Sequence, residues 1–146
     1  MLSVRKIIGE LGTSNIKRII LGVGCVLIVA GVIFGGKYLI SVQKYKKITS
    51  ELKIGSVDLS KISNGTYTGS CDALFVAATV SVIIKDHKIT NIILLKHKTE
   101  RGKPAEVIPD KVVKAQSLQV DTISGATNSS KVILKSIENA LDSGKS

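Results

Sequence analysis

The stretch ALFVAATVSVIIKDHKITNIILLKH, residues 73–97, decides the fold. Its first half alternates apolar with small or polar residues at period two, which is the pattern of a strand with one buried face. The expected buried face holds Val76, Ala78, Val80, Val82 and Ile84. The polar pair Asp86-His87 predicts a tight turn, and ITNIILLKH returns as a second strand. We therefore predict an antiparallel β-hairpin over this stretch.

Segments on both sides of the hairpin predict a third strand and several helices. NGTYTGS, residues 64–70, contains an Asn-Gly turn signal followed by β-forming residues. Pro104 and Pro109 each suit the first turn of a short helix, because that position needs no backbone N–H. A final helix carries an apolar stripe at helical spacing: Val132, Ile133, Ile137, Ala140 and Leu141. We predict an α+β fold, in which a small antiparallel sheet packs with two or three helices.

The N-terminal part of the chain is strongly apolar. IILGVGCVLIVAGVIFGG, residues 19–36, is uncharged, and as a helix it spans about 27 Å, close to the hydrocarbon core of a bilayer. A cleaved signal peptide is the alternative, but its apolar core is usually about 7–15 residues long and leads to a small-residue cleavage site. We predict a single transmembrane helix over residues 19–40, between a basic segment at 1–18 and a juxtamembrane spacer at 41–62. The domain is then expected at residues 63–142, and whether the spacer folds with it is left open.

Charge and composition narrow the range of partners. The formal net charge is +10, which favours anionic lipid as a neighbour. The lysines are scattered and aromatic residues are few, so nucleic acid is not expected as a partner. Basic residues flank the apolar run on both sides, and only the pair Lys17-Arg18 favours a cytoplasmic N-terminus. His87 and His97 stand apart from each other and from the two cysteines, so we expect exposed histidines and no metal site.

The motif DTISGATNSS opens the final helix with small and hydroxyl-bearing residues. One interpretation is ordinary capping, with Thr127 or Asn128 as the cap and Ser130 in the first turn. The other is a phosphate site, because a helix N-terminus carries unpaired backbone N–H groups and a partial positive charge. Gly125 and Ala126 would then let the ligand approach the backbone closely. The residues alone leave both interpretations open.

The chain from Ser63 to Leu141 resembles the FMN-binding domain family, which also occurs in subunits of Rnf-type complexes and of sodium-pumping NADH:quinone reductases. The resemblance rests on NGTYTGS, on the hairpin, and on an acidic residue followed by Ser-Gly-Ala-Thr, here Asp121 and then Ser124 to Thr127. In the family this motif is recognised by a flavin transferase, which moves FMN from FAD onto the final Thr or Ser as a phosphoester. The resemblance therefore implies covalent FMN on Thr127.

The neighbours of this threonine have expected roles as well. Asp121 is expected to help present the motif to the transferase, and its alternative role is an Asx turn in a loop. No catalytic residue is expected. The loop ERGKPAEVIP departs from the glycine- and aromatic-rich family pattern, so no contact to the flavin ring is assigned. The other expected cofactor-binding residues are Ser124, Gly125, Ala126, Asn128 and Ser130.

The implied function is electron transfer through covalent FMN in a membrane-anchored bacterial flavoprotein, as a carrier more than as a self-contained enzyme. Expected partners are the flavin transferase, the lipid bilayer, and membrane redox proteins or other quinone- or NADH-linked electron-transfer proteins. Because the transferases of the family act outside the cytoplasm, we expect a cytoplasmic N-terminus and an extracytoplasmic FMN domain at the cell membrane. Two alternatives stay open: a non-flavinylated membrane-tethered binding or assembly module, and a sensor that binds FMN non-covalently.

Overall fold

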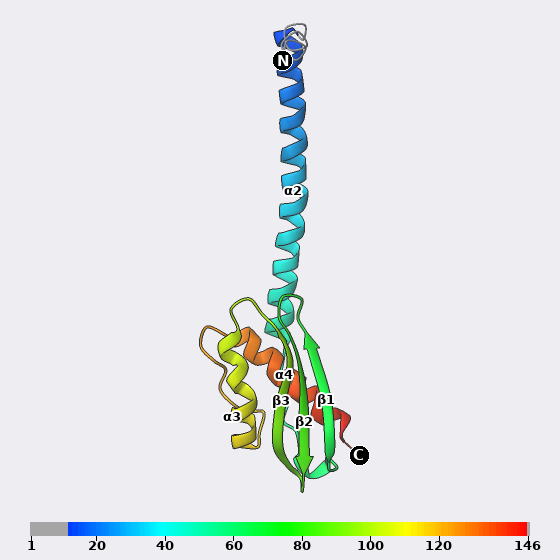
Figure 1. Cartoon of the computed structure of the whole chain (residues 1–146), viewed down its shortest axis with the longest axis vertical. Coiled ribbons are helices and arrows are strands. Elements are labelled where there is room, and N and C mark those ends of the chain that lie inside the picture. Colours follow the sequence, from blue (N-terminus) through cyan, green and yellow to red (C-terminus); the bar gives the residue numbers. More distant parts are fainter. Residues whose placement is uncertain (1–11, 146) are drawn as a thin grey trace, which may run out of the picture. The chain divides into compact units, whose positions relative to one another are not determined.

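A computed structural model describes residues 12–145 of the 146-residue chain. The chain separates into a first unit that ends at Gln43 and a second unit that begins at Lys44. The second unit holds a three-stranded antiparallel sheet and helices, so the predicted α+β class is confirmed. In chain order (Figure 1) the elements are α2 (Thr13–Glu51), η1 (Leu59–Lys61), β1 (Gly65–Asp72), β2 (Ala77–Lys85), β3 (Lys88–Lys98), η2 (Lys103–Val107), α3 (Ile108–Ala115) and α4 (Thr127–Ser143).

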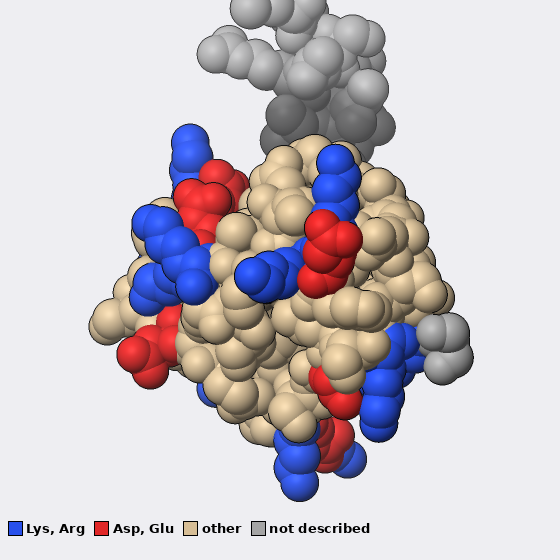
Figure 2. Space-filling view, turned by 90° about the horizontal axis from the view of Figure 1, so that it is seen from below, with Lys and Arg blue, Asp and Glu red and all other residues tan. Residues whose placement is uncertain are grey.

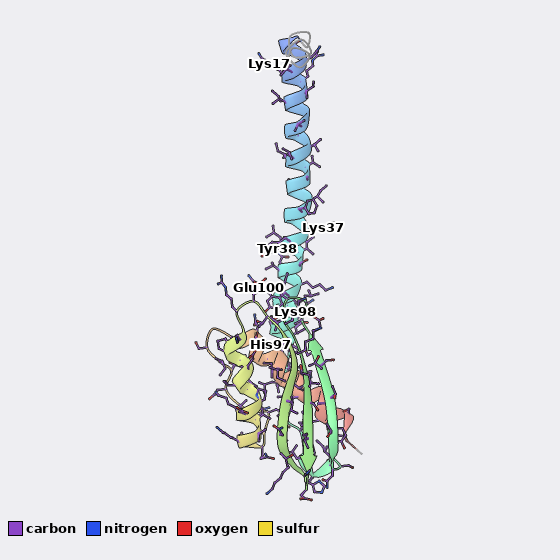
Figure 3. The ribbon with its side chains drawn as sticks, in the orientation of Figure 1. Lys17, Lys37, Tyr38, His97, Lys98 and Glu100 are labelled. Carbon is purple, nitrogen blue, oxygen red and sulfur yellow. The ribbon has the colours of Figure 1, made fainter. Side chains whose placement is uncertain are left out.

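Helix α2 contains the apolar run that the sequence singles out. Within the described part of the chain it is the one helix long and apolar enough to cross a bilayer. Its apolar side chains are exposed to the surroundings, as a lipid-facing helix requires. Figure 3 shows Lys17 near its beginning and the neighbours Lys37 and Tyr38 beyond the apolar run. Most of the predicted basic segment, at residues 1–11, lies outside the described residues.

The predicted hairpin forms from β2 and β3, and its turn lies where the sequence places it. Asp86 and His87 both have positive φ, 51° and 59°, which is the backbone of a type I′ turn. The expected buried face is confirmed, since Val80 and Val82 are fully buried. The predicted start of the first strand is wrong, because β2 begins at Ala77 and not at Ala73.

Residues 73–76 instead connect β1 to β2. β1 ends at Asp72, which pairs with Ala77, so the four residues between them must reverse the chain. The Asp72 carboxylate accepts a hydrogen bond from the Leu74 N–H at 2.8 Å, and Leu74 adopts a φ of 69°. The Ala73 N–H closes the turn by donating to the Val76 carbonyl at 2.8 Å. Periodicity alone does not reveal such a turn, because its residues are as apolar as the strand that follows.

The helices cover one face of the sheet. α4 packs on β1 and β2, and α3 packs on β3. The apolar stripe predicted on α4 is buried, with Ile133 and Ile137 fully inside. Gln116 follows the last residue of α3 as its C-cap. Its side-chain amide accepts from the N–H of Ile89 and donates to the Ile89 carbonyl, at 2.9 and 2.8 Å. This amide satisfies the backbone of β3 where the strand has no further neighbour.

The segment after Gln43 packs with the domain. The Tyr45 ring meets Phe75 edge to face at 5.4 Å between centroids. The Gly55 N–H donates to the Glu138 carboxylate at 3.2 Å, and Ile62 is fully buried. These contacts bring residues 44–62 of the predicted spacer into the second unit, which begins at Lys44.

Candidate functional site

A tight turn precedes α4 and sets the position of the Ser-Gly-Ala-Thr motif. The Ala126 N–H donates to the Ile123 carbonyl at 2.9 Å, which closes a turn over Ser124 and Gly125. Gly125 has a φ of 77°, a conformation that other L-residues adopt only with strain. A Cβ at this position would meet no neighbouring atom, so the backbone dihedral explains the glycine better than close packing does.

The buried hydroxyl of Ser130 stabilises this turn by bonding to the backbone at both of its ends. Its hydroxyl accepts from the Ile123 N–H at 3.0 Å and donates to the Ala126 carbonyl at 2.9 Å. Ser130 is fully buried, and the Ala126 side chain also lies in the core. Two of the expected cofactor-binding residues are therefore placed beneath the motif and not at its surface.

The start of α4 is open. Ala126 occupies the N-cap position, no side chain caps the helix, and no acidic residue lies in its first turn. The expectation that Thr127 or Asn128 caps the helix is wrong, because Thr127 is already the first helical residue. Across residues 12–145, the backbone N–H groups of Thr127, Asn128 and Ser129 find no hydrogen-bond acceptor. Such an N-terminus attracts an anion.

Thr127 presents its hydroxyl to solvent at this open end. Thr127 and Asn128 are exposed, and Ser124 and Gly125 beside them are exposed as well. The Thr127 hydroxyl forms no hydrogen bond with any residue that the structure describes. The arrangement offers a free hydroxyl next to a set of unpaired N–H donors, which suits a phosphoester on Thr127.

Asp121 lies at one side of the motif, in a groove between α3 and the segment that leads to α4. The groove has a volume of about 450 Å³. The Asp121 side chain is exposed and makes no hydrogen bond within the described range, so the alternative Asx turn does not form there. The carboxylate is accessible to another protein. The residues that line the groove are Lys111, Lys114, Ala115, Gln119, Val120 and Asp121.

Sequence reasoning missed the loop that flanks the first turn of α4. The Thr99 hydroxyl accepts from the Gly102 N–H at 2.7 Å and hydrogen-bonds to the Ser129 hydroxyl at 3.1 Å. Gly102 is buried, and a Cβ there would collide with the side chains of Ser129 and Thr99. The loop is thereby fixed against α4 two residues after Thr127. A Thr-x-x-Gly spacing hints at the local turn, but the bond to Ser129 spans 30 positions and leaves no local signal.

His97 differs from the expectation of an exposed histidine. Its side chain is only 3% exposed, and its Nδ1 lies 3.1 Å from the Glu106 carboxylate. Figure 3 shows His97, Lys98 and Glu100 together where β3 ends. His87 is exposed, as expected. Among the described residues no three His, Cys, Asp or Glu side chains gather as a metal site would require.

The surface charges do not gather by sign on the face drawn in Figure 2. Lysine and arginine side chains alternate there with aspartate and glutamate. Mixed charges of this kind hold a protein in solution without giving a continuous track for a phosphate backbone.

Part of the chain is similar to known proteins. Residues 76–142 match the family model described as the FMN-binding domain. Over 85 residues, or 56% of this chain, the sequence is 35% identical to an NADH:acrylate oxidoreductase of Vibrio harveyi. The chain spans 8% of that relative's length. The matched residues include both the hairpin and the motif at Thr127.

Proposed function

We propose, because residues 76–142 match the model of the FMN-binding domain family, that this chain carries electrons through FMN attached to Thr127. The observation that supports the attachment site is the exposed, unpartnered hydroxyl of Thr127 at an uncapped helix start. Thr127 also matches the final Thr of the Ser-Gly-Ala-Thr motif in the family that the chain resembles. A flavin-binding redox role for the domain follows from the family and from its oxidoreductase relative.

The attachment is a phosphoryl transfer that conserves the redox state of the flavin. The Thr127 Oγ1 attacks the FMN phosphorus of FAD, and the pyrophosphate bond of FAD breaks. AMP leaves, and the threonine hydroxyl loses its proton. A flavin transferase performs this step, and the exposed Asp121 is accessible to it. The product is a phosphodiester with one negative charge.

The residues around Thr127 stabilise the negative charge of the phosphodiester and fix the backbone that carries it. The N–H groups of Thr127, Asn128 and Ser129 point out of the helix start and favour an anion. The Gly125 turn and the buried Ser130 keep the backbone before the helix rigid. FMN, when attached, supplies the electron-carrying chemistry, and the protein supplies position and electrostatics.

The proposed setting is the extracytoplasmic side of a bacterial cell membrane. α2 is long and apolar enough to serve as the anchor. The N-terminus would lie in the cytoplasm and the second unit outside, because the transferases of the family act there. Donor and acceptor would be membrane redox proteins or other quinone- or NADH-linked electron-transfer proteins. Since the chain spans 8% of its oxidoreductase relative, we propose carriage of electrons and not that enzyme's reaction.

Co-expression with a flavin transferase tests the proposal. On a denaturing gel we expect a fluorescent flavin band for the wild type and for Thr68→Ala, the matched control at an exposed threonine of β1 outside the motif. The band should disappear in Thr127→Ala. If flavin co-purifies but is lost on denaturation, the non-covalent sensor is favoured. If no flavin is bound in either state, the chain is a binding or assembly module.

A further inference from the structure

Three lysines follow the apolar run of α2 on one helical turn, residues 44–47, which we call the lysine turn. Lys44, Lys46 and Lys47 are all exposed, and all three belong to the second unit. Within the described range 12–145, the ammonium groups of Lys44 and Lys46 form no ion pair or hydrogen bond. Lys47 lies 3.9 Å from the exposed Glu51 carboxylate, and an exposed pair of this kind neutralises little charge. The lysine turn therefore presents a concentrated positive charge to its surroundings.

The domain covers one side of the lysine turn. The Tyr45 ring packs edge to face on Phe75, in the connection between β1 and β2. Successive residues of a helix point about 100° apart, so Lys44 and Lys46 flank Tyr45 on either side. Lys47 points about 200° away from Tyr45. The three ammonium groups therefore lie on the sides of the helix that this packing leaves open.

The position of the lysine turn along α2 matches the level of lipid phosphates. Exposed apolar side chains continue along the helix to Ile40. The Ser41 hydroxyl donates to the Lys37 carbonyl at 3.0 Å, so this polar group is satisfied within the helix. From Ile40 the rise is about 6 Å to Lys44 and about 10 Å to Lys47. Because the headgroup layer on each side of a bilayer is about 5–8 Å thick, the long lysine side chains can reach it.

We propose that the lysine turn binds the phosphate groups of anionic lipids at the membrane surface from which α2 emerges. The inference rests on the proposed membrane anchor and is independent of FMN. Between Thr13 and Ser50 the helix holds no acidic residue that would compete with the lipid phosphates. An ammonium group close to an anionic surface raises affinity about fivefold. Because Tyr45 packs on the domain in the same turn, the bound lipids tie the second unit to the headgroup layer.

Spin-labelled lipids test the proposal on the full-length chain reconstituted in phosphatidylcholine vesicles. Electron spin resonance distinguishes lipids held at the protein from lipids in the bulk bilayer. It gives the association constant of phosphatidylglycerol, which is anionic, relative to that of zwitterionic phosphatidylcholine. We expect a ratio of about 3 for the wild type, and a fall to about 1 in 1 M salt, where charges are screened within about 3 Å. Lys44→Gln/Lys46→Gln should lose about half of the excess over 1, because Lys17 and Arg18 act at the other end of the helix.

A matched double variant separates a local contact from a general effect of net charge. Lys85→Gln/Lys88→Gln removes the same charge from exposed residues at the hairpin turn, at the end of β2 away from the Phe75 connection. It should keep the wild-type ratio. A wild-type ratio of 1, an unchanged ratio in Lys44→Gln/Lys46→Gln, or an equal loss in the hairpin variant would each overturn the proposal.

The same vesicles distinguish failure of this inference from failure of the proposed anchor. An anchored chain stays in the vesicles during an alkaline wash, whereas a chain held at the surface is removed. Loss of the wild-type chain in the wash would refute the anchor itself. Retention of the chain without a preference for phosphatidylglycerol would refute lipid binding by the lysine turn and leave the anchor intact.

Discussion

At the residue scale, four consecutive residues at the start of α4 have two different roles. Thr127 and Asn128 are exposed, whereas Ser129 and Ser130 are buried. Successive residues of a helix point about 100° apart, so a run of polar residues cannot stay on one side. Ser129 bonds to the 99–102 loop and Ser130 bonds to the turn before the helix. The buried pair fixes the scaffold on which the Thr127 hydroxyl is presented.

Ser130→Ala tests the scaffold role of this buried hydroxyl. The change leaves the Ile123 N–H without its acceptor, so we expect the free energy of unfolding to fall by about 1–3 kcal/mol. Urea unfolding of the detergent-solubilised chain measures it. Ser124→Ala, at an exposed position of the same turn, should change stability by less than about 0.5 kcal/mol. Equal stabilities for the two variants would show that Ser130 does not support the turn.

At the element scale, the hairpin and the final helix are readable from the sequence because their side chains repeat with the period of a strand or of a helix. The turn at Asp86-His87 is readable because polar residues interrupt two apolar runs. The start of β2 is not, since the connection at residues 73–76 is as apolar as the strand. The N-cap of α4 is not readable either, because a hydroxyl residue near a helix start need not occupy the N-cap position.

The candidate site likewise has a part that can be predicted from the sequence and a part that only the structure shows. Thr127 is proposed as the attachment residue from the sequence alone, because its motif is local and specific. The burial of Ser130 and the loop bond between Thr99 and Ser129 depend on contacts between distant segments, which no local pattern records. The side chain of His97 is buried, and its partner Glu106 lies nine positions further along, on η2. The sequence therefore predicts the attachment point, and the structure adds the contacts of Ser129 and Ser130 that fix the backbone around it.

Ile62→Ala tests whether the segment between α2 and β1 belongs to the domain. Ile62 is fully buried and its carbonyl lies 3.2 Å from the His87 ring nitrogen. We expect a loss of about 2–5 kcal/mol in the free energy of unfolding, because the substitution leaves a cavity in the core. Ile93→Ala, at a side chain that is 45% exposed on the sheet, is the matched control and should cost much less. A cost for Ile62→Ala no larger than the control's would make the segment a simple spacer.

At the scale of the whole molecule, the proposed account requires the two ends of α2 to lie on opposite sides of a membrane. Basic residues flank the apolar run on both sides, so charge alone gives a weak orientation signal. The orientation is instead proposed from the site of flavin transfer. It places the FMN domain where a membrane redox partner outside the cytoplasm can reach it.

Reporter fusions test this topology. Alkaline phosphatase fused after the last residue should be active in intact cells, because that enzyme folds only outside the cytoplasm. A fluorescent protein that matures only in the cytoplasm, fused at the same point, should stay dark. If the fluorescent-protein fusion were bright and the phosphatase fusion inactive, the second unit would lie inside the cell. The same reporters fused at the N-terminus provide the reciprocal control.

The central claim is that FMN is joined to one specific hydroxyl, that of Thr127. Peptide mass spectrometry of the co-expressed, full-length protein tests it most directly, with fragmentation that retains the phosphoester. The account predicts a mass increase of one FMN less one water on the peptide that carries the motif, with fragment ions placing it on Thr127. Placement on Ser124, Ser129 or Ser130, or an unmodified peptide in a sample where the transferase is active, would contradict it.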